Sequence, residues 1–156
     1  MRKLKVLMLG VLCFTILFTV TGCGNKTAIS SDDFKSRMEQ KGFSVQEATS
    51  QFSEYDYVEK VYIALSDDSK YQIEFYELSD ADKASSFFNN NKELFEDSKS
   101  SSSSETSVNL GNNSKYTLTT NGKYKVVSRI DNTVIYLDVA DNYKSNIKDI
   151  LKDLGY

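Results

Sequence analysis

Residues with chemically reactive side chains are few in this 156-residue chain, and structural roles explain most of them. The chain has no His, so it lacks the usual base at neutral pH and the commonest metal ligand. Carboxylates come close together in three places: Asp32 with Asp33, Asp67 with Asp68, and Asp80 with Asp82. Each place is an expected helix start or turn, where Asp is favoured for capping. Calcium is the metal that these oxygen ligands would suit, but the EF-hand spacing is absent. We therefore expect no catalytic residue, no cofactor and no metal.

The N-terminal segment has the pattern of a signal peptide. Arg2, Lys3 and Lys5 form a basic start without any acid, and residues 6–20 are an uninterrupted stretch of apolar, Gly, Thr and Cys residues. This stretch is shorter than the roughly 20 residues that a helix needs to cross a bilayer. A basic start followed by a short apolar run is typical of a leader that is removed. Cys13 would leave with it, so Cys23 would be the single Cys of the mature chain, without a disulfide partner.

The residues that follow the apolar stretch are Val20, Thr21, Gly22 and Cys23. This motif resembles the lipobox of bacterial lipoproteins, and the whole pattern is similar to small lipoproteins of Gram-positive bacteria. The resemblance implies cleavage after Gly22 and a diacylglyceryl group on the sulfur of Cys23. The protein would then be a lipid-anchored protein of the cell membrane, on its extracytoplasmic face. Two acyl chains, at about 0.8 kcal/mol per buried CH₂, suffice for stable anchoring. The alternative is an ordinary secreted protein with an unmodified Cys after its leader.

The charge of the mature chain restricts its partners. Three of the 19 Lys and Arg residues lie in the leader, so 16 basic residues face 22 acidic ones and the net charge is −6. This balance argues against nucleic acid as a partner. The basic residues are dispersed along the sequence, and we expect no anion-binding track from them. The expected organisation is a leader at 1–22, a lipidated tether at 23–30, and a single domain at 31–156.

Periodicity and turn residues predict alternating helices and strands. Helices are expected from Ser31 to a stop at Gly42, from a capping box at Ser79 and Asp82 to about Phe95, and from a cap at Asp141 to Gly155. Strands are expected at 57–65, 71–78, 116–120, 124–130 and 133–139. Asn121 and Gly122 predict a type I′ hairpin turn. The last helix has the clearest apolar stripe: Tyr143, Ile147, Ile150, Leu151 and Leu154. The segment 43–53 is ambiguous, and residues 98–107 are expected to form a Ser-rich flexible loop because they include no apolar side chain.

These elements predict an α+β fold, with an antiparallel sheet and helices packed on one face. Two halves, each a strand pair followed by a helix, suggest a pseudo-repeat at an offset of 62 residues. The other face of the sheet would then be open to solvent, and it would present Arg129, Tyr62, Tyr76 and Tyr136. Tyr and Arg are enriched in binding hot spots, so this face is the expected interaction surface. Two alternatives stay open, since cross-strand aromatic pairs stabilise any sheet and Arg129 is also a potential partner of Asp131 or Asp138.

The function expected from the sequence is that of a non-enzymatic binding or accessory module, anchored in the membrane, for a partner in the membrane or cell envelope. The first alternative is an inhibitor or immunity-type protein that blocks an enzyme or toxin at the cell surface. A hydrolase that uses carboxylates is a third hypothesis.

Overall fold

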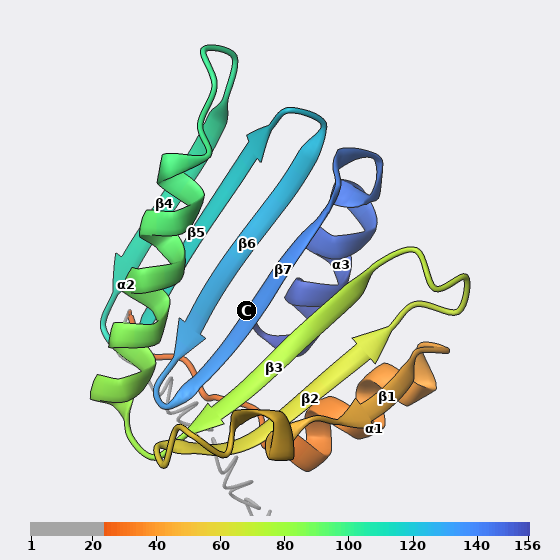
Figure 1. Cartoon of the computed structure of the whole chain (residues 1–156), viewed down its shortest axis with the longest axis vertical. Coiled ribbons are helices and arrows are strands. Elements are labelled where there is room, and N and C mark those ends of the chain that lie inside the picture. Colours follow the sequence, from red (N-terminus) through yellow and green to blue (C-terminus); the bar gives the residue numbers. More distant parts are fainter. Residues whose placement is uncertain (1–23) are drawn as a thin grey trace, which may run out of the picture.

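A computed structural model describes residues 24–156, which build one seven-stranded antiparallel sheet with helices on both faces (Figure 1). The strand order is β1-β2-β3-β7-β6-β5-β4. The predicted leader and Cys23 lie outside the described residues. The helices are α1 (Ser31–Gln40), α2 (Ala81–Asp97) and α3 (Lys144–Leu154), with short 3-10 helices η1 (Thr49–Phe52) and η2 (Asp141–Tyr143). The strands are β1 (Ser44–Glu47), β2 (Val58–Leu65), β3 (Gln72–Leu78), β4 (Ser104–Leu110), β5 (Asn113–Thr120), β6 (Lys123–Ile130) and β7 (Thr133–Ala140).

One face of the sheet is covered by α1 and α3, and we call it the α1/α3 face. Phe34 of α1 stacks on Phe75 of β3 with ring centroids 4.7 Å apart, and both side chains are fully buried. The apolar stripe of α3 contacts the same core through Ile147, Leu151 and Leu154. All four aliphatic residues that the sequence assigned to this stripe, Ile150 included, are buried, so the predicted amphipathic helix is confirmed.

The opposite face is covered by α2, and we call it the α2 face (Figure 1). Phe88 and Phe95 of α2 share a buried cluster with residues of β2, β3, β5, β6 and β7. The prediction that the helices pack on one face is therefore wrong. The physical reason is that the central strands have apolar side chains on both faces, as Val126 and Val127 of β6 show, so both faces must be removed from water.

Most predicted elements are confirmed, with small differences at the helix starts. Asn121 and Gly122 have positive φ angles of 49° and 73°, as a type I′ turn requires. The N-cap of α2 is Asp80, whose side chain accepts a hydrogen bond from the Lys83 amide at 2.8 Å, rather than Ser79. Asp141 begins η2 and makes no capping hydrogen bond to α3. The ambiguous segment 43–53 forms β1 and η1.

The prediction of a flexible loop at 98–107 is wrong for its second part. Residues from Ser104 onward belong to β4, which pairs with β5 over its full length, from Ser104 opposite Thr119 to Leu110 opposite Asn113. All seven β4 residues are exposed, and its first four residues are polar, so the start of the strand has no apolar pattern that the sequence could reveal. Backbone hydrogen bonds and polar side chains hold it instead.

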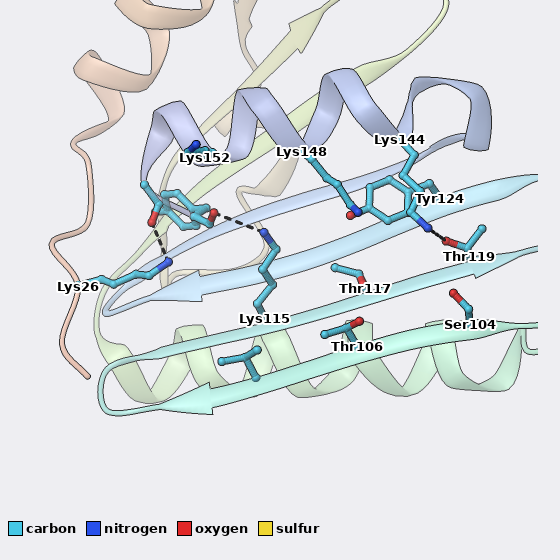
Figure 2. Close-up of a pocket in the computed structure, with 13 residues that line it drawn as sticks. Lys26, Ser104, Thr106, Lys115, Thr117, Thr119, Tyr124, Lys144, Lys148 and Lys152 are labelled. Atoms are coloured by element: carbon cyan, nitrogen blue, oxygen red, sulfur yellow. Dashed lines mark hydrogen bonds between the residues drawn. The ribbon is translucent and has the colours of Figure 1, made fainter. Parts of the chain in front are cut away.

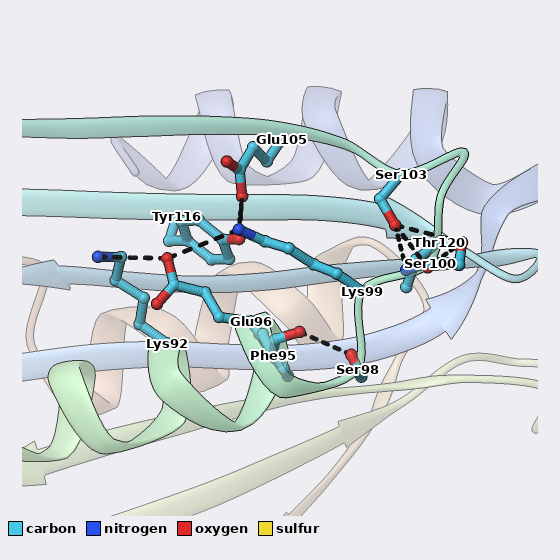
Figure 3. A network of polar contacts seen from close by, with 10 residues as sticks. All are labelled: Lys92, Phe95, Glu96, Ser98, Lys99, Ser100, Ser103, Glu105, Tyr116 and Thr120. Atoms are coloured by element: carbon cyan, nitrogen blue, oxygen red, sulfur yellow. Dashed lines mark hydrogen bonds and ion pairs between the residues drawn. The ribbon is translucent and has the colours of Figure 1, made fainter.

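Two polar clusters fasten the start of β4 (Figure 3). The carboxylate of Glu105 accepts hydrogen bonds from the Tyr116 hydroxyl and the Lys99 ammonium group, each at 2.5 Å. Burial and this bond to Glu105 raise the pKa of Tyr116 to about 12. At the turn before β4, the Ser103 hydroxyl donates to Thr120 at 2.8 Å. These contacts fix the polar segment at the edge of the sheet, where it forms part of the floor of the site described next.

Candidate functional site

A groove lined by lysines opens on the α1/α3 face, between α3 and the β4–β5 pair (Figure 2). It exists because α3 covers the middle strands and leaves this side of β4 and β5 uncovered. Its volume is about 490 Å³. The side chains that give it its chemistry are five lysines, four hydroxyl residues and two tyrosines: Lys26, Lys115, Lys144, Lys148, Lys152, Ser104, Thr106, Thr117, Thr119, Tyr124 and Tyr156. We call this feature the lysine groove.

One wall of the lysine groove is a row of three lysines on α3. Lys144, Lys148 and Lys152 recur every fourth residue, which places them along one side of the helix about 6 Å apart. The neighbouring stripe of the same helix is buried, and this packing fixes the direction in which the row points. Lys148 and Lys152 are exposed, whereas Lys144 is half-buried and donates a hydrogen bond to the Thr119 hydroxyl at 2.9 Å.

Hydroxyl groups of β4 and β5 form the floor of the lysine groove. They come together there because alternate residues of paired strands point to the same face of the sheet. Thr106 of β4 lies opposite Thr117 of β5, and Ser104 lies opposite Thr119. All four residues line the groove. The floor therefore offers hydrogen-bond donors beside the cationic wall, a combination that suits phosphate or carboxylate oxygens.

The charges in the lysine groove lack counterions within the described part of the chain. None of its five lysines forms an ion pair there, while seven lysines elsewhere do. No Asp or Glu is among its lining residues within 24–156. An α-carboxylate on Tyr156, the last residue printed, would offset one charge and leave four. A chain with more acidic than basic residues thus concentrates positive charge at one place.

Lys115 is the most confined of these lysines. Its side chain is half-buried, and the one hydrogen bond that its ammonium group donates within the described part of the chain, to the Tyr156 carbonyl, is long at 3.4 Å. Burial lowers the pKa of Lys115, and the nearby charges of Lys26 and Lys148 lower it further. An anion bound between these three groups would offset both effects, so binding an anion here should raise the pKa of Lys115.

The fifth lysine comes from the segment expected to be a tether. The Lys26 amide donates to the Asn112 side chain at 2.8 Å, and Asn112 donates back to the Lys26 carbonyl at 2.7 Å. The Lys26 ammonium group donates to the Gly155 carbonyl at the end of α3, at 3.0 Å. Residues 24–26 are therefore docked on the domain, and they close one end of the lysine groove.

The expected interaction surface is not an open face. Tyr76 pairs with Val61 and Tyr62 pairs with Phe75, so the two tyrosines point to opposite faces of the sheet. Tyr76 and Tyr62 are only 5% and 6% exposed, and Tyr136 packs under α2. The prediction that Tyr62, Tyr76, Tyr136 and Arg129 share a solvated surface is wrong, because α2 covers the face that three of them share.

Arg129 lies on the α2 face and is 9% exposed. Its guanidinium donates to the Asp131 carbonyl at 3.2 Å and to the Ser114 hydroxyl at 3.4 Å, while Nε has no partner in the described residues. Neither Asp131 nor Asp138 forms an ion pair with it. It is a buried cation held by weak hydrogen bonds.

Exchange of Arg129 for Met should leave the free energy of unfolding unchanged or raise it by about 1 kcal/mol, because a buried charge is replaced by an apolar side chain of similar length. Exchange for Ala should lower it, since the space under α2 is left empty. Urea unfolding of both variants checks this. If the Met variant loses as much stability as the Ala variant, the hydrogen bonds of the guanidinium outweigh the cost of its burial.

Comparison with protein-family models, curated proteins and solved structures found no match to this chain. Within residues 24–156, no helix is long and apolar enough to cross a membrane. The same residues contain no group of three or more Cys, Asp and Glu side chains that could hold a metal ion.

Sequence patterns do not predict the lysine groove, because the basic residues are dispersed along the chain. Its lysines come from the tether, β5 and α3, and only the folded chain brings positions 26, 115 and 144–152 together. One signal was available. Lys144, Lys148 and Lys152 recur at the helical period beside the apolar stripe, which predicts a cationic edge on α3.

Proposed function

We propose that the protein is a lipoprotein of the extracytoplasmic membrane face, anchored through a diacylglyceryl group on Cys23, and that its domain binds anionic ligands without catalysis. The main evidence is the lysine groove, in which five lysines converge that form no ion pair within residues 24–156, in a chain of net negative charge. Charge-assisted hydrogen bonds from lysine and threonine to phosphate or carboxylate are about twice as strong as neutral ones.

The shape of the lysine groove favours a chain-like ligand over a single small ion. The row on α3 spans about 12 Å from Lys144 to Lys152, at 1.5 Å per residue. Negative groups spaced about 6 Å apart along a ligand would each meet one lysine of this row. A polymer or oligomer with closely repeated phosphate or carboxylate groups offers pairs of charges at this separation along its length.

A titration with inorganic polyphosphate tests the proposed activity. We expect binding whose affinity falls as salt rises, because the attraction comes from charges that ions screen. Neutral dextran of similar length should not bind. Absence of polyphosphate binding at low salt, or affinity that does not change with salt, would overturn the proposal. Selective capture of an acidic protein in place of polyanions would support the inhibitor or immunity-type alternative.

Exchange of Cys23 for Ser tests the proposed anchor. Serine has no thiol to carry the diacylglyceryl group, so the variant should leave the detergent phase and its N-terminus should lack the mass of the lipid. A Cys13→Ser variant is the matched control, and it should stay in the detergent phase because Cys13 lies in the leader. Unchanged partitioning and unchanged N-terminal mass of the Cys23 variant would refute lipidation at this residue.

The pseudo-repeat also stays a proposal. The segments β2-β3-α2 and β6-β7-α3 have the same order, and β3 and β7 meet as neighbours with Phe75 opposite Ile135. The two helices nevertheless cover opposite faces of the sheet. A shared origin of the halves would therefore require that one helix changed face.

A further inference from the structure

The end of the lysine groove next to the tether is also the end from which the lipid anchor would emerge. Gly24 lies against the turn between β4 and β5, where its carbonyl accepts a hydrogen bond from the Asn113 side chain at 2.7 Å. A Cβ atom on Gly24 would be 3.5 Å from the Leu110 side chain. Consecutive Cα atoms are 3.8 Å apart, so a lipid on Cys23 would begin beside this turn. We call this part of the molecule the anchor end.

Exposed apolar side chains are concentrated at the anchor end. Four large apolar residues are exposed within residues 24–156, and two of them, Val108 and Leu110, are the last alternate residues of β4. They are 44% and 51% exposed and lie on the α1/α3 face, the side on which the lysine groove opens. Exposed apolar residues beside a lipid attachment point suit the boundary between lipid headgroups and acyl chains.

Lysines of the groove lie near Val108, the first of these two apolar residues. Lys115 lies directly opposite Val108 in the β4–β5 pair. Figure 2 shows Lys26, Lys115 and Lys152 at one end of the lysine groove and Lys144 at the other end. Lys26 and Lys152 are exposed, so their charges are available to a neighbouring surface.

We propose that the anchor end docks on the bilayer that holds the lipid, with phosphate groups of anionic lipids on Lys26, Lys115 and Lys152. This inference rests on the proposed function, because it assigns a membrane phosphate as the anion at one end of the same groove. The bilayer is favoured over a soluble anion here because the lysines, the apolar pair and the anchor lie together. The opposite end, with Lys144 and Thr119, stays open to soluble ligand.

Because the lipid already holds the protein at the membrane, a weak attraction between the anchor end and the headgroups is sufficient for docking. Once the lipid is inserted, docking is an intramolecular event with a high effective concentration of headgroups. Each lysine near an anionic surface strengthens the attraction about fivefold, and this effect falls off within a Debye length of about 8 Å at physiological salt. The docked tether, which ties Lys26 to Asn112, keeps the anchor end within that range.

The experiment uses the lipidated full-length protein in vesicles of phosphatidylcholine, alone or mixed with phosphatidylglycerol. A polarity-sensitive dye is attached to a Leu110→Cys variant, in which the acylated Cys23 does not react. We expect the dye to report an apolar environment only when phosphatidylglycerol is present. The matched control is Ser101→Cys, in the turn at the other end of β4, and its dye should report water in both vesicles (Figure 1).

Lysine exchanges then test the headgroup contacts. Replacing Lys26 and Lys152 with Gln should weaken docking about thirtyfold, whereas Lys144→Gln at the far end should leave it unchanged. Circular dichroism confirms that each variant is folded. Docking that is equal in both vesicles, or that survives the exchange of Lys26 and Lys152, overturns the inference.

Polyphosphate binding by the lipidated protein with all five groove lysines in place separates the two proposals. Intact polyphosphate binding without phosphatidylglycerol-dependent docking overturns the membrane inference alone. Loss of both polyphosphate binding and phosphatidylglycerol-dependent docking overturns the proposed function as well.

Discussion

Exchange of Lys148 and Lys152 for Glu should abolish polyphosphate binding at physiological salt. The double variant removes two positive charges from the wall of the lysine groove and adds two negative ones. At about 1 kcal/mol for each unit of charge near an anionic partner, the loss is about 4 kcal/mol, or about a thousandfold in affinity. Both side chains are exposed and form no ion pair within residues 24–156, so the fold should be retained. Calorimetric titration measures the difference.

The matched control for this prediction changes the same number of charges elsewhere. Lys35 on α1 and Lys83 on α2 lie outside the lysine groove, and neither forms an ion pair among the described residues. Exchange of both for Glu should leave polyphosphate affinity within about threefold, because neither side chain lines the groove and salt screens charges that are not in contact with the ligand. An equal loss in both double variants would mean that net charge, rather than the groove, determines binding.

Exchange of Leu151 for Ala should destabilise the domain by about 2–5 kcal/mol. Leu151 is fully buried in the core of the α1/α3 face, and its removal leaves a cavity between α3 and the sheet. Urea unfolding measures the change as a lower midpoint with an unchanged slope. Since α3 carries three lysines of the groove, ligand binding should fall only under conditions where the variant unfolds.

Asp149→Ala is the control for this prediction, because Asp149 is an exposed residue of the same helix. Its effect on stability should stay within about 0.5 kcal/mol. A loss below 1 kcal/mol for Leu151→Ala would contradict the packing of α3 against the sheet.

Local patterns were sufficient to predict most helices and strands. The alternation of Ile73 and Phe75 indicated β3, and the residues 121–122 indicated the β5–β6 turn, because each signal depends on neighbouring residues alone. The stripe of α3 is equally local. An antiparallel sheet followed from consecutive strands joined by short turns.

The parts that were not predicted depend on contacts between distant residues. β4 has only polar residues before Val108, and its pairing with β5 uses the backbone, which leaves no side-chain pattern. The faces of the β2–β3 hairpin depend on its register, because a shift by one residue exchanges the two faces. The observed pairing of Tyr62 with Phe75 separates Tyr62 from Tyr76.

The lysine groove also depends on contacts between residues that are distant in the sequence. Lys26 and Lys115 are far apart in the sequence, and they become neighbours because the tether docks at Asn112 and because β5 lies next to β6, near α3. Neither contact follows from composition or periodicity. The row on α3 could be predicted, but the groove that it borders could not.

Amide chemical shifts of the isotope-labelled, unlipidated Cys23→Ser protein during titration with inorganic polyphosphate test the central claim most directly. The lysine groove predicts that the changes concentrate in three segments, 104–108, 115–119 and 144–152. Residues of the separate pocket around Tyr57 and Phe87, near α2, should stay unchanged. Shifts that are absent at low salt, or that concentrate around Tyr57 and Phe87, would contradict the assignment of the lysine groove as the anion-binding site.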